Sequence, residues 1–263
     1  MKIVVIGGTG LIGSKVVDKL REQGHEAVPA SPRLGINSIT GEGLAAAMDG
    51  TAVVVDVSNS PNFEYRTAMD FFQTSTRNLL AVEAAAGIGH HVALSVVGTA
   101  ALAEGGEPDT TTAGYFRAKL AQEQLIRGSG IPYSIVHATQ FYEFITAIAD
   151  QATEGGTVRI PPILFQPMAA DDVATGVCRV AVETPVNGIV EIAGPARLEF
   201  DEAVIRVLAA ADDPRHVVAD ASAGYYGIVV SERTLVPEDG AHLGEIRLDD
   251  WIRQSTATKS AVA

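Results

Sequence analysis

Two side chains with the spacing of an acid–base pair lie near the middle of the chain. Tyr115 and Lys119 are four residues apart in a helical pattern, so both lie on one face of the expected helix. A free tyrosine has a pKa of about 10, and a neighbouring ammonium lowers that pKa by stabilising the phenolate. Ser95 lies near the end of the strand expected before this helix. A tyrosine with a lowered pKa is closer to the range in which an acid or base works at neutral pH. The same spacing also occurs by chance on helices where the tyrosine is packed and the lysine is solvated.

A glycine-rich turn at the start of the chain could bind phosphate. The apolar run at residues 3–6 indicates a buried strand, and a helical period follows the glycines. Gly7 permits the tight turn, Gly10 lets a pyrophosphate approach the backbone, and Gly13 lets the helix pack closely. A glycine turn without a ligand is the alternative, but the strand before it and the helix after it favour a dinucleotide site. The predicted binding residues are Gly7, Thr9, Gly10, Leu11, Ile12 and Gly13.

The segment GGTGLIG, followed downstream by the Y-x-x-x-K pattern, resembles the short-chain dehydrogenase/reductase superfamily. The resemblance is to its atypical NmrA-like, NAD(P)H-binding branch in particular. It implies that Tyr115 donates or removes the substrate proton. It also implies that Lys119 holds the ribose hydroxyls and tunes Tyr115, while Ser95 orients the carbonyl oxygen.

Two features depart from the pattern of this superfamily. Extended members carry an Asn in the long middle helix that relays protons to the lysine, and Phe72 occupies the matching position here. Gln73 or Asn78 could substitute. Many NmrA-like members bind NADP without turnover, and some act as redox-sensing regulators. Those members usually lack the Tyr and Lys that this chain keeps, which favours an enzyme.

The second strand indicates which dinucleotide is preferred. An NAD-specific fold places an Asp or Glu at its end, about 20 residues past the glycines. Here the segment reads Pro-Ala-Ser-Pro-Arg, and no acid follows until Glu42. Ser31 can hydrogen-bond a 2′-phosphate, and Arg33 can clamp it. A plain turn with a solvated cation is the alternative, but both changes favour NADP (NADPH) over NAD.

Two further loops are expected at the carboxyl edge of the sheet, where ligands bind in open parallel sheets. Ser58 and Asn59 end the third strand and are predicted to contact the cofactor, with capping of the next turn as the alternative. Gln140, Phe141 and Tyr142 follow a later strand, where relatives place the nicotinamide and the edge of the substrate pocket. The two aromatic residues could equally be ordinary core residues.

The other polar candidates have simpler interpretations. Asp171 and Asp172 are predicted to cap a helix, although the NmrA-like branch shares this pattern. His90 and His91 are assigned to a polar turn, because no third metal ligand accompanies them at useful spacing. His137 is expected to be a satisfied core residue. No metal site is predicted.

Composition excludes several classes of protein. The chain has 263 residues, of which 47% are hydrophobic, and a net charge of −13. This charge argues against a nucleic-acid partner, because phosphate binding needs clustered Lys and Arg. No apolar run is long enough for a membrane span, and the first strand begins at once, so no signal peptide is expected. The single cysteine, Cys178, is expected in the core. A cytoplasmic location follows.

Strand and helix patterns alternate along the chain, which predicts an α/β fold with a doubly wound parallel sheet, Rossmann-like. Expected strands cover residues 26–30, 52–57, 92–97, 133–137 and 189–193, and expected helices cover residues 44–48, 68–86, 115–127, 141–149, 171–182 and 200–211. We expect one NAD(P)-binding domain over 1–263. By resemblance, a small C-terminal substrate-binding lobe comes mainly from 139–256. The tail beyond Thr256 is expected to be frayed.

The functional hypothesis is an NADP(H)-dependent oxidoreductase that reduces a ketone, enone or quinone carbonyl, a small-molecule substrate. A non-catalytic NADP(H) sensor or regulator and an epimerase or isomerase are the alternatives. Tyr115 and Lys119 favour an enzyme over a sensor. The sequence identifies neither the substrate nor the oligomeric state.

Overall fold

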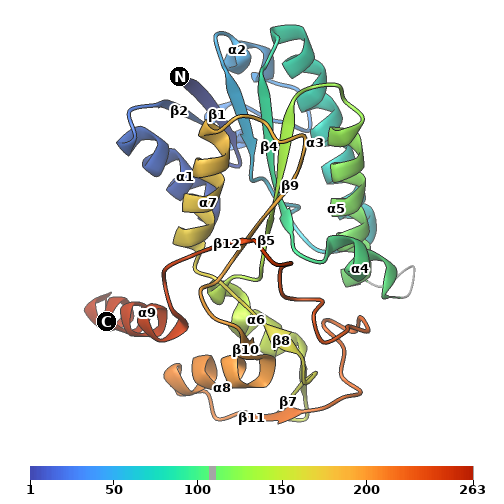
Figure 1. Ribbon diagram of the computed structural model, residues 1–263, viewed down its shortest axis with the longest axis vertical. Coiled ribbons are helices and arrows are strands. Elements are labelled where there is room, and N and C mark those ends of the chain that lie inside the picture. Colours follow the sequence, from blue (N-terminus) through green and yellow to red (C-terminus); the bar gives the residue numbers. More distant parts are fainter. Residues whose placement is uncertain (107–110, 263) are drawn as a thin grey trace.

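A seven-stranded parallel sheet forms the centre of the computed structural model, which describes residues 1–106 and 111–262 (Figure 1). The strand order is β12-β9-β5-β4-β3-β1-β2, and every neighbouring pair is parallel. The strands are β1 (Lys2–Ile6), β2 (Glu26–Ala30), β3 (Val53–Asp56), β4 (His90–Val96), β5 (Tyr133–Ala138), β9 (Gly188–Ala193) and β12 (His242–Leu243). The predicted doubly wound, Rossmann-like class is confirmed.

Alternate residues of each strand face opposite helical layers. In β1, Ile3 and Val5 pack toward α1 (Leu11–Glu22) and α7 (Ala170–Val182). Val4 and Ile6 pack toward α2 (Leu44–Met48) and α3 (Tyr65–Ala86). Figure 1 shows α1 and α7 on one side of the sheet and α3 with α5 (Thr111–Arg127) on the other. Burial on both faces explains why β1 is a continuous apolar run.

A second group of elements lies beyond the carboxyl ends of the strands, at the lower end of Figure 1. It comprises η2 (Tyr142–Phe144), α6 (Ile145–Gln151), β6 (Thr153–Glu154), β7 (Thr157–Ile160), β8 (Leu164–Phe165), β10 (Leu198–Glu199), α8 (Phe200–Ala210) and β11 (His216–Ala219). Its apolar side chains join those of α5 in one cluster, in which Phe116 packs with Phe165, Phe200 and Tyr225. This cluster connects the sheet layer to the C-terminal part of the chain.

Most predicted elements occur with shifted ends, but some differ. The short η1 (Pro32–Leu34) and α4 (Thr99–Glu104) were not predicted. The segment predicted as one helix over 141–149 divides into η2 and α6. The helix α9 (Leu248–Val262) continues past Thr256, into the tail that was expected to be frayed. Cys178 is buried in α7, as expected. In the part of the chain that the structure describes, no helix is long and apolar enough to cross a membrane.

His90 and His91 do not form a polar turn, which corrects that prediction. They open β4 and are both buried, because the strand starts two residues earlier than the apolar run suggests. His90 contacts the Ser134 hydroxyl at 2.9 Å, and burial lowers the pKa of His90 to about 4. His91 Nδ1 lies 2.9 Å from both carboxylate oxygens of Glu83, and neither side chain of this pair is exposed. Burial opposes protonation of His91, but the charge and hydrogen bonding of Glu83, helped by Asp56, raise the pKa of His91.

We expect Glu83→Leu to lower the free energy of unfolding by about 3–5 kcal/mol, because it leaves a buried histidine without its partner. A histidine whose folded pKa is raised stabilises fully below its unfolded pKa of about 6.5, and this contribution is lost as pH rises through the folded value. The difference from wild type should therefore be largest below about pH 6.5. Urea unfolding at several pH values measures it, with Glu22→Leu on the exposed side of α1 as control. A pH-independent difference would contradict the ionic pairing.

Candidate functional site

The glycine turn between β1 and α1 has the geometry of an anion site. Gly7 has φ +78°, and a Cβ there would lie 2.9 Å from the Ser58 backbone. A Cβ on Gly13 would lie 2.1 Å from the Gly7 carbonyl oxygen, so only glycine allows α1 to pack this closely. Gly10 is exposed, and at this N-cap no side chain caps α1. The first-turn amides, at Leu11 and Ile12, can therefore bind a phosphate.

The end of β2 lies against this turn, and Ser31 and Arg33 follow it along the chain. The Ala30 carbonyl at the end of β2 accepts hydrogen bonds from Gly7 N at 3.0 Å and Gly8 N at 3.2 Å. Ser31 follows directly and is 7% exposed, and its hydroxyl has no hydrogen-bond partner among the described residues. Arg33 is exposed on η1. An unpartnered hydroxyl and an exposed guanidinium two residues later are groups that can bind the phosphate end of an adenosine ribose.

The loop after β3 lies between the glycine turn and α5. Asp56 accepts hydrogen bonds from the Ser58 amide at 3.0 Å and the Ser58 hydroxyl at 2.6 Å, which fixes the turn. The Ser58 backbone lies against Gly7. Asn59, the next residue, accepts a hydrogen bond from the Tyr115 hydroxyl at 3.0 Å. This loop therefore brings the predicted cofactor residues and the predicted acid to one edge of the sheet.

Tyr115 lies among aromatic side chains near the start of α5. Its ring packs edge-on against Phe63, Phe72 and Phe116, with centroid distances of 4.9, 5.8 and 5.5 Å. Burial raises the pKa of Tyr115, and the hydrogen bond to Asn59 opposes this rise only partly. The expectation of a lowered tyrosine pKa is therefore wrong for this arrangement. The helical spacing puts Lys119 on the same side of α5, but its charge does not offset the burial of Tyr115.

The Lys119 ammonium has buried partners of its own. Lys119 is 3% exposed, and its Nζ donates to the Leu94 carbonyl at 2.8 Å and to Gln122 Oε1 at 2.5 Å. Nζ also lies 4.4 Å from the centroid of the Phe72 ring. Phe72 thus contacts the lysine from the middle helix, where the superfamily pattern places the relay Asn. Burial lowers the pKa of Lys119 to about 8, although the negative charges of Asp56 and Glu123 oppose this shift.

Ser95 is buried beside a carboxylate that the sequence analysis did not select. Its hydroxyl donates to Glu123 Oε1 at 2.6 Å, and His137 Nε2 lies 2.9 Å from the same oxygen. The hydrogen bonds to His137 and Ser95, with the nearby Lys119, lower the pKa of Glu123 against the effect of burial. His137 is a satisfied core residue, as expected. The role of Ser95 toward a substrate carbonyl stays a prediction.

The sequence analysis missed three residues of this site, Glu123, Gln122 and Asp56. Glu123 lies four residues after Lys119, so the spacing Tyr115, Lys119, Glu123 marks one helix face and could have identified it. Gln122 is adjacent, but it carries no comparable signal. Asp56 ends the third strand, where a buried carboxylate needs partners that only the folded chain supplies.

Gln140 reaches the same edge of the sheet from the end of β5. It is 7% exposed, and neither polar atom of its amide has a partner at full hydrogen-bond geometry in the described structure. The amide still influences the Tyr225 hydroxyl, where it weakly opposes the rise in pKa that burial causes. Most of the hydrogen-bonding capacity of the buried Gln140 amide is therefore unused within the described residues.

The two aromatic residues after Gln140 have packing roles. Phe141 stacks on Phe144 with centroids 5.5 Å apart. Tyr142 is buried and donates to the Ile246 carbonyl at 3.1 Å, and burial raises its pKa. Tyr142 thus packs as a core aromatic, and contact of either ring with a substrate stays a prediction.

Asp171 and Asp172 do not cap α7, which corrects that prediction. Asp171 pairs with Lys15 at 2.8 Å, and Asp172 accepts from the Ile246 amide at 2.9 Å. The Ala170 amide is instead satisfied by Glu143 at 3.2 Å, because η2 brings that carboxylate to the helix start. Within residues 1–106 and 111–262, no group of three His, Cys, Asp or Glu side chains could hold a metal ion.

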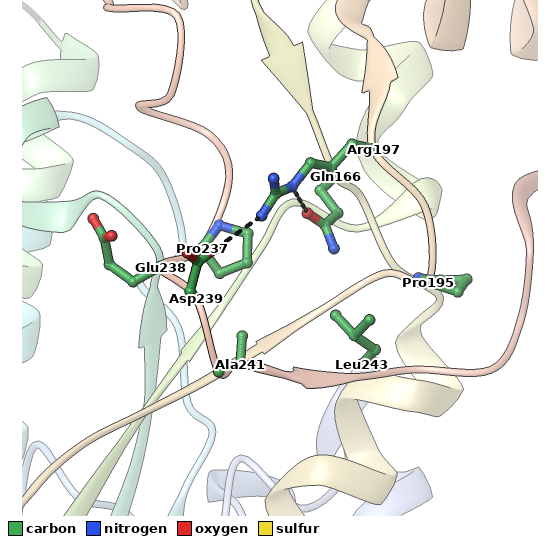
Figure 2. Close-up of a pocket in the computed structure, with 9 residues that line it drawn as sticks. Gln166, Pro195, Arg197, Pro237, Glu238, Asp239, Ala241 and Leu243 are labelled. Atoms are coloured by element: carbon green, nitrogen blue, oxygen red, sulfur yellow. Dashed lines mark hydrogen bonds and ion pairs between the residues drawn. The ribbon is translucent and has the colours of Figure 1, made fainter.

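A separate cavity of about 260 Å³ lies beyond the end of β9. It is lined by Gln166, Pro195, Arg197, Pro237, Glu238, Asp239, Gly240, Ala241 and Leu243. Figure 2 shows Arg197 directed at Gln166 and Asp239. Arg197 donates a hydrogen bond to Gln166 Oε1 at 3.0 Å and forms an ion pair with Asp239 at 3.7 Å. No pattern in the sequence indicated this cavity, because the lining comes from separate segments of the chain.

Comparison with known structures supports the fold assignment. The chain is 16% identical to a short-chain dehydrogenase/reductase superfamily protein from Agrobacterium tumefaciens with bound NAD, covering 99% of this chain and 98% of that one with a TM-score of 0.71. A UDP-glucose 4-epimerase from Thermus thermophilus in complex with NAD gives 16% identity, full coverage of both chains and a TM-score of 0.71. A dTDP-4-dehydrorhamnose reductase from Clostridium acetobutylicum gives 14% identity, coverage of 98% and 100%, and a TM-score of 0.66.

No curated protein sequence matches the chain. A family model described as NAD(P)H-binding matches residues 36–181, which is more than half of the chain. The match covers α5 with Tyr115 and Lys119 and begins after the glycine turn, whose geometry is independent evidence for dinucleotide binding. The chain belongs to the NAD(P)H-binding family and has the fold of an atypical short-chain dehydrogenase/reductase.

Proposed function

We propose that the protein is an NADP(H)-dependent oxidoreductase that reduces a ketone, enone or quinone carbonyl, with Tyr115 as the proton donor. The observation that carries this proposal is the position of the Tyr115 hydroxyl. It donates to Asn59 in the loop that lies against the glycine turn. A dinucleotide on the α1 amides therefore extends along the edge where Tyr115 stands. When bound, NADPH supplies the hydride.

The preference for NADP over NAD rests on the end of β2. Ser31 has a buried, unpartnered hydroxyl, and Arg33 stands exposed two residues later. A 2′-phosphate would satisfy both groups, whereas the bare hydroxyl of NAD leaves the guanidinium unused. The structures with bound NAD named above have the same fold at 16% identity, so their cofactor does not decide this choice.

The raised pKa of Tyr115 suits the direction of reduction. A partly buried phenol with a raised pKa stays protonated at neutral pH and can give its proton to a developing alkoxide. Gln140, whose amide lacks a full hydrogen-bond partner, can bind a second polar group of the substrate. The chain's contribution is to position the carbonyl and hold the proton.

A non-catalytic NADP(H) sensor is the second candidate. The contacts of Lys119 favour it, because two N–H groups of Nζ are bonded to Leu94 and Gln122 inside the protein. Phe72 in place of an Asn removes a polar relay toward that lysine. An epimerase or isomerase would use the same edge of the sheet and the same tyrosine.

Gly10→Val should abolish NADPH binding in a folded protein. A Cβ at Gly10 meets only the Gly7 carbonyl oxygen, at 3.3 Å, so the turn must shift by a few tenths of an ångström, and the added side chain stands in the path of the pyrophosphate. Calorimetric titration with NADPH measures the loss. Gly128→Val, at the other end of the sheet, is the matched control. Unchanged affinity in a folded Gly10→Val protein would remove the site from this turn.

Arg33→Ala should weaken NADPH binding by about 1.5–3 kcal/mol, the range for hydrogen bonds to charged groups. NADH binding should barely change, because NADH lacks the 2′-phosphate. Titration of both cofactors against the variant tests this, with Arg77→Ala on α3 as control. Equal losses for the two cofactors would show that Arg33 does not read the phosphate.

Tyr115→Phe should reduce turnover by about 10²–10⁴, the usual effect of losing a positioned acid, while NADPH affinity stays nearly unchanged. Lys119→Met should lower both, because Lys119 is proposed to contact the ribose. NADPH oxidation with a panel of ketones, enones and quinones is the assay. Tyr133→Phe, at the start of β5, is the control.

In the alcohol-oxidation direction the rate should rise toward high pH, because the raised pKa keeps Tyr115 protonated at neutral pH.

Two results would count against this assignment. A wild-type protein that binds NADPH tightly but turns over no carbonyl favours the sensor. Full activity of Tyr115→Phe on an identified substrate would leave the enzyme in place and remove Tyr115 as its acid.

A further inference from the structure

Three side chains from two distant segments form a continuous buried chain beneath the candidate site. Gln122 Oε1 accepts from the Lys119 ammonium, and Gln122 Nε2 donates to Asp56 Oδ2 at 3.0 Å. Asp56 Oδ1 in turn accepts from the amide and hydroxyl of Ser58. The relative exposures of Asp56, Lys119 and Gln122 are 1%, 3% and 2%. The chain therefore connects the lysine to the loop that carries Asn59.

An amide is well suited to the middle of this chain. Its oxygen accepts from a cation while its nitrogen donates to an anion, so one neutral side chain satisfies both buried charges. A carboxylate there would face Asp56 with like charge, and an apolar residue would remove one hydrogen bond from each of the two buried charges. A hydrogen bond to a buried charge is costly to lose, so the residue at position 122 matters for the contacts of the ammonium.

We infer that Gln122 and Asp56 are positioning residues that hold Lys119 at the end of β4 and tie it to the loop at residues 58–60. Through these contacts one polar chain fixes the positions of two residues. They are Lys119, which is proposed to bind the ribose, and Asn59, which accepts a hydrogen bond from Tyr115. The inference rests on the proposed function for the role of Lys119 toward the cofactor. The hydrogen bonds that carry it do not depend on that role.

Several charged or polar groups face the ammonium from the surrounding elements. Asp56 approaches from β3 and Glu123 from α5, and both favour the charged lysine. His137 of β5 shares the Glu123 carboxylate, and Phe72 of α3 covers Nζ. Burial outweighs these effects and brings the pKa of Lys119 to about 8. A change at residue 122 should therefore move the ionisation of Lys119 within a measurable range.

The test follows Lys119 directly by NMR. The protein is labelled with ¹³C at lysine Cε, the Lys119 signal is identified by its absence in Lys119→Met, and its shift is titrated with pH. Gln122→Leu removes an acceptor, so the midpoint should fall. Gln122→Glu adds a negative charge beside the ammonium, so the midpoint should rise. Gln124→Leu and Gln124→Glu, at an exposed position of the same helix, should leave it unchanged.

NADPH affinity, measured across the same pH range, gives a second readout. Gln122→Leu should weaken binding at pH 8 by about 10-fold or more, the effect of one lost hydrogen bond to a charged group. Gln122→Glu keeps an acceptor and should retain affinity to higher pH than Gln122→Leu. Opposite shifts of the NMR midpoint, with matching shifts in affinity, support the inference. A purely structural role would not give opposite signs.

The result that overturns the inference is a Lys119 midpoint that stays at the wild-type value in both Gln122 variants. If Gln122→Leu does not fold, the near-isosteric Gln122→Glu and Asp56→Asn still decide, because each changes the charge around Lys119. Asp56→Asn should lower the midpoint. Failure of the wild type to bind NADPH would overturn the proposed function instead, since the NMR titration needs no cofactor.

Discussion

The Lys119 ammonium is buried, and a buried ammonium is stable only with acceptors and counter-charges around it. Here a strand carbonyl, the Gln122 amide and the Phe72 ring contact it directly, and Asp56 and Glu123 supply the negative charge. These groups come from β3, β4, α3 and α5. These four elements therefore come together at one end of the sheet around a single charged group, the Lys119 ammonium.

The same contacts order the edge of the sheet where the cofactor is proposed to bind. Asp56 links the lysine to the loop after β3, because one of its oxygens accepts a hydrogen bond from Gln122 and the other accepts one from Ser58. Ser58 lies against the glycine turn, and its neighbour Asn59 meets the Tyr115 hydroxyl. Anion site, loop and candidate acid are consequently parts of one connected arrangement. Satisfied polar networks of this kind hold side chains in defined positions.

Local patterns were sufficient to predict the parallel sheet except for its edge strand β12, and to predict the glycine turn. They failed where an element's environment depends on distant segments. His90 and His91 were predicted to lie in a polar turn, yet both are buried in β4, where Ser134 of β5 is the partner of His90 and Glu83 of α3 is the partner of His91. Asp171 and Asp172 read as caps, yet η2 supplies the Glu143 carboxylate that takes this place. In each case the missing information was a partner that only the fold brings near.

The sequence by itself determined that Gly7, Gly10 and Gly13 leave space beside α1, and that Tyr115 and Lys119 share a helix face, because both follow from local geometry. Only the tertiary structure decided how these groups ionise. Spacing on a helix says which side chains are neighbours, but not how much water or which charges surround them. Packing partly buries Tyr115 and raises its pKa, while the ammonium of Lys119 donates a hydrogen bond to Gln122.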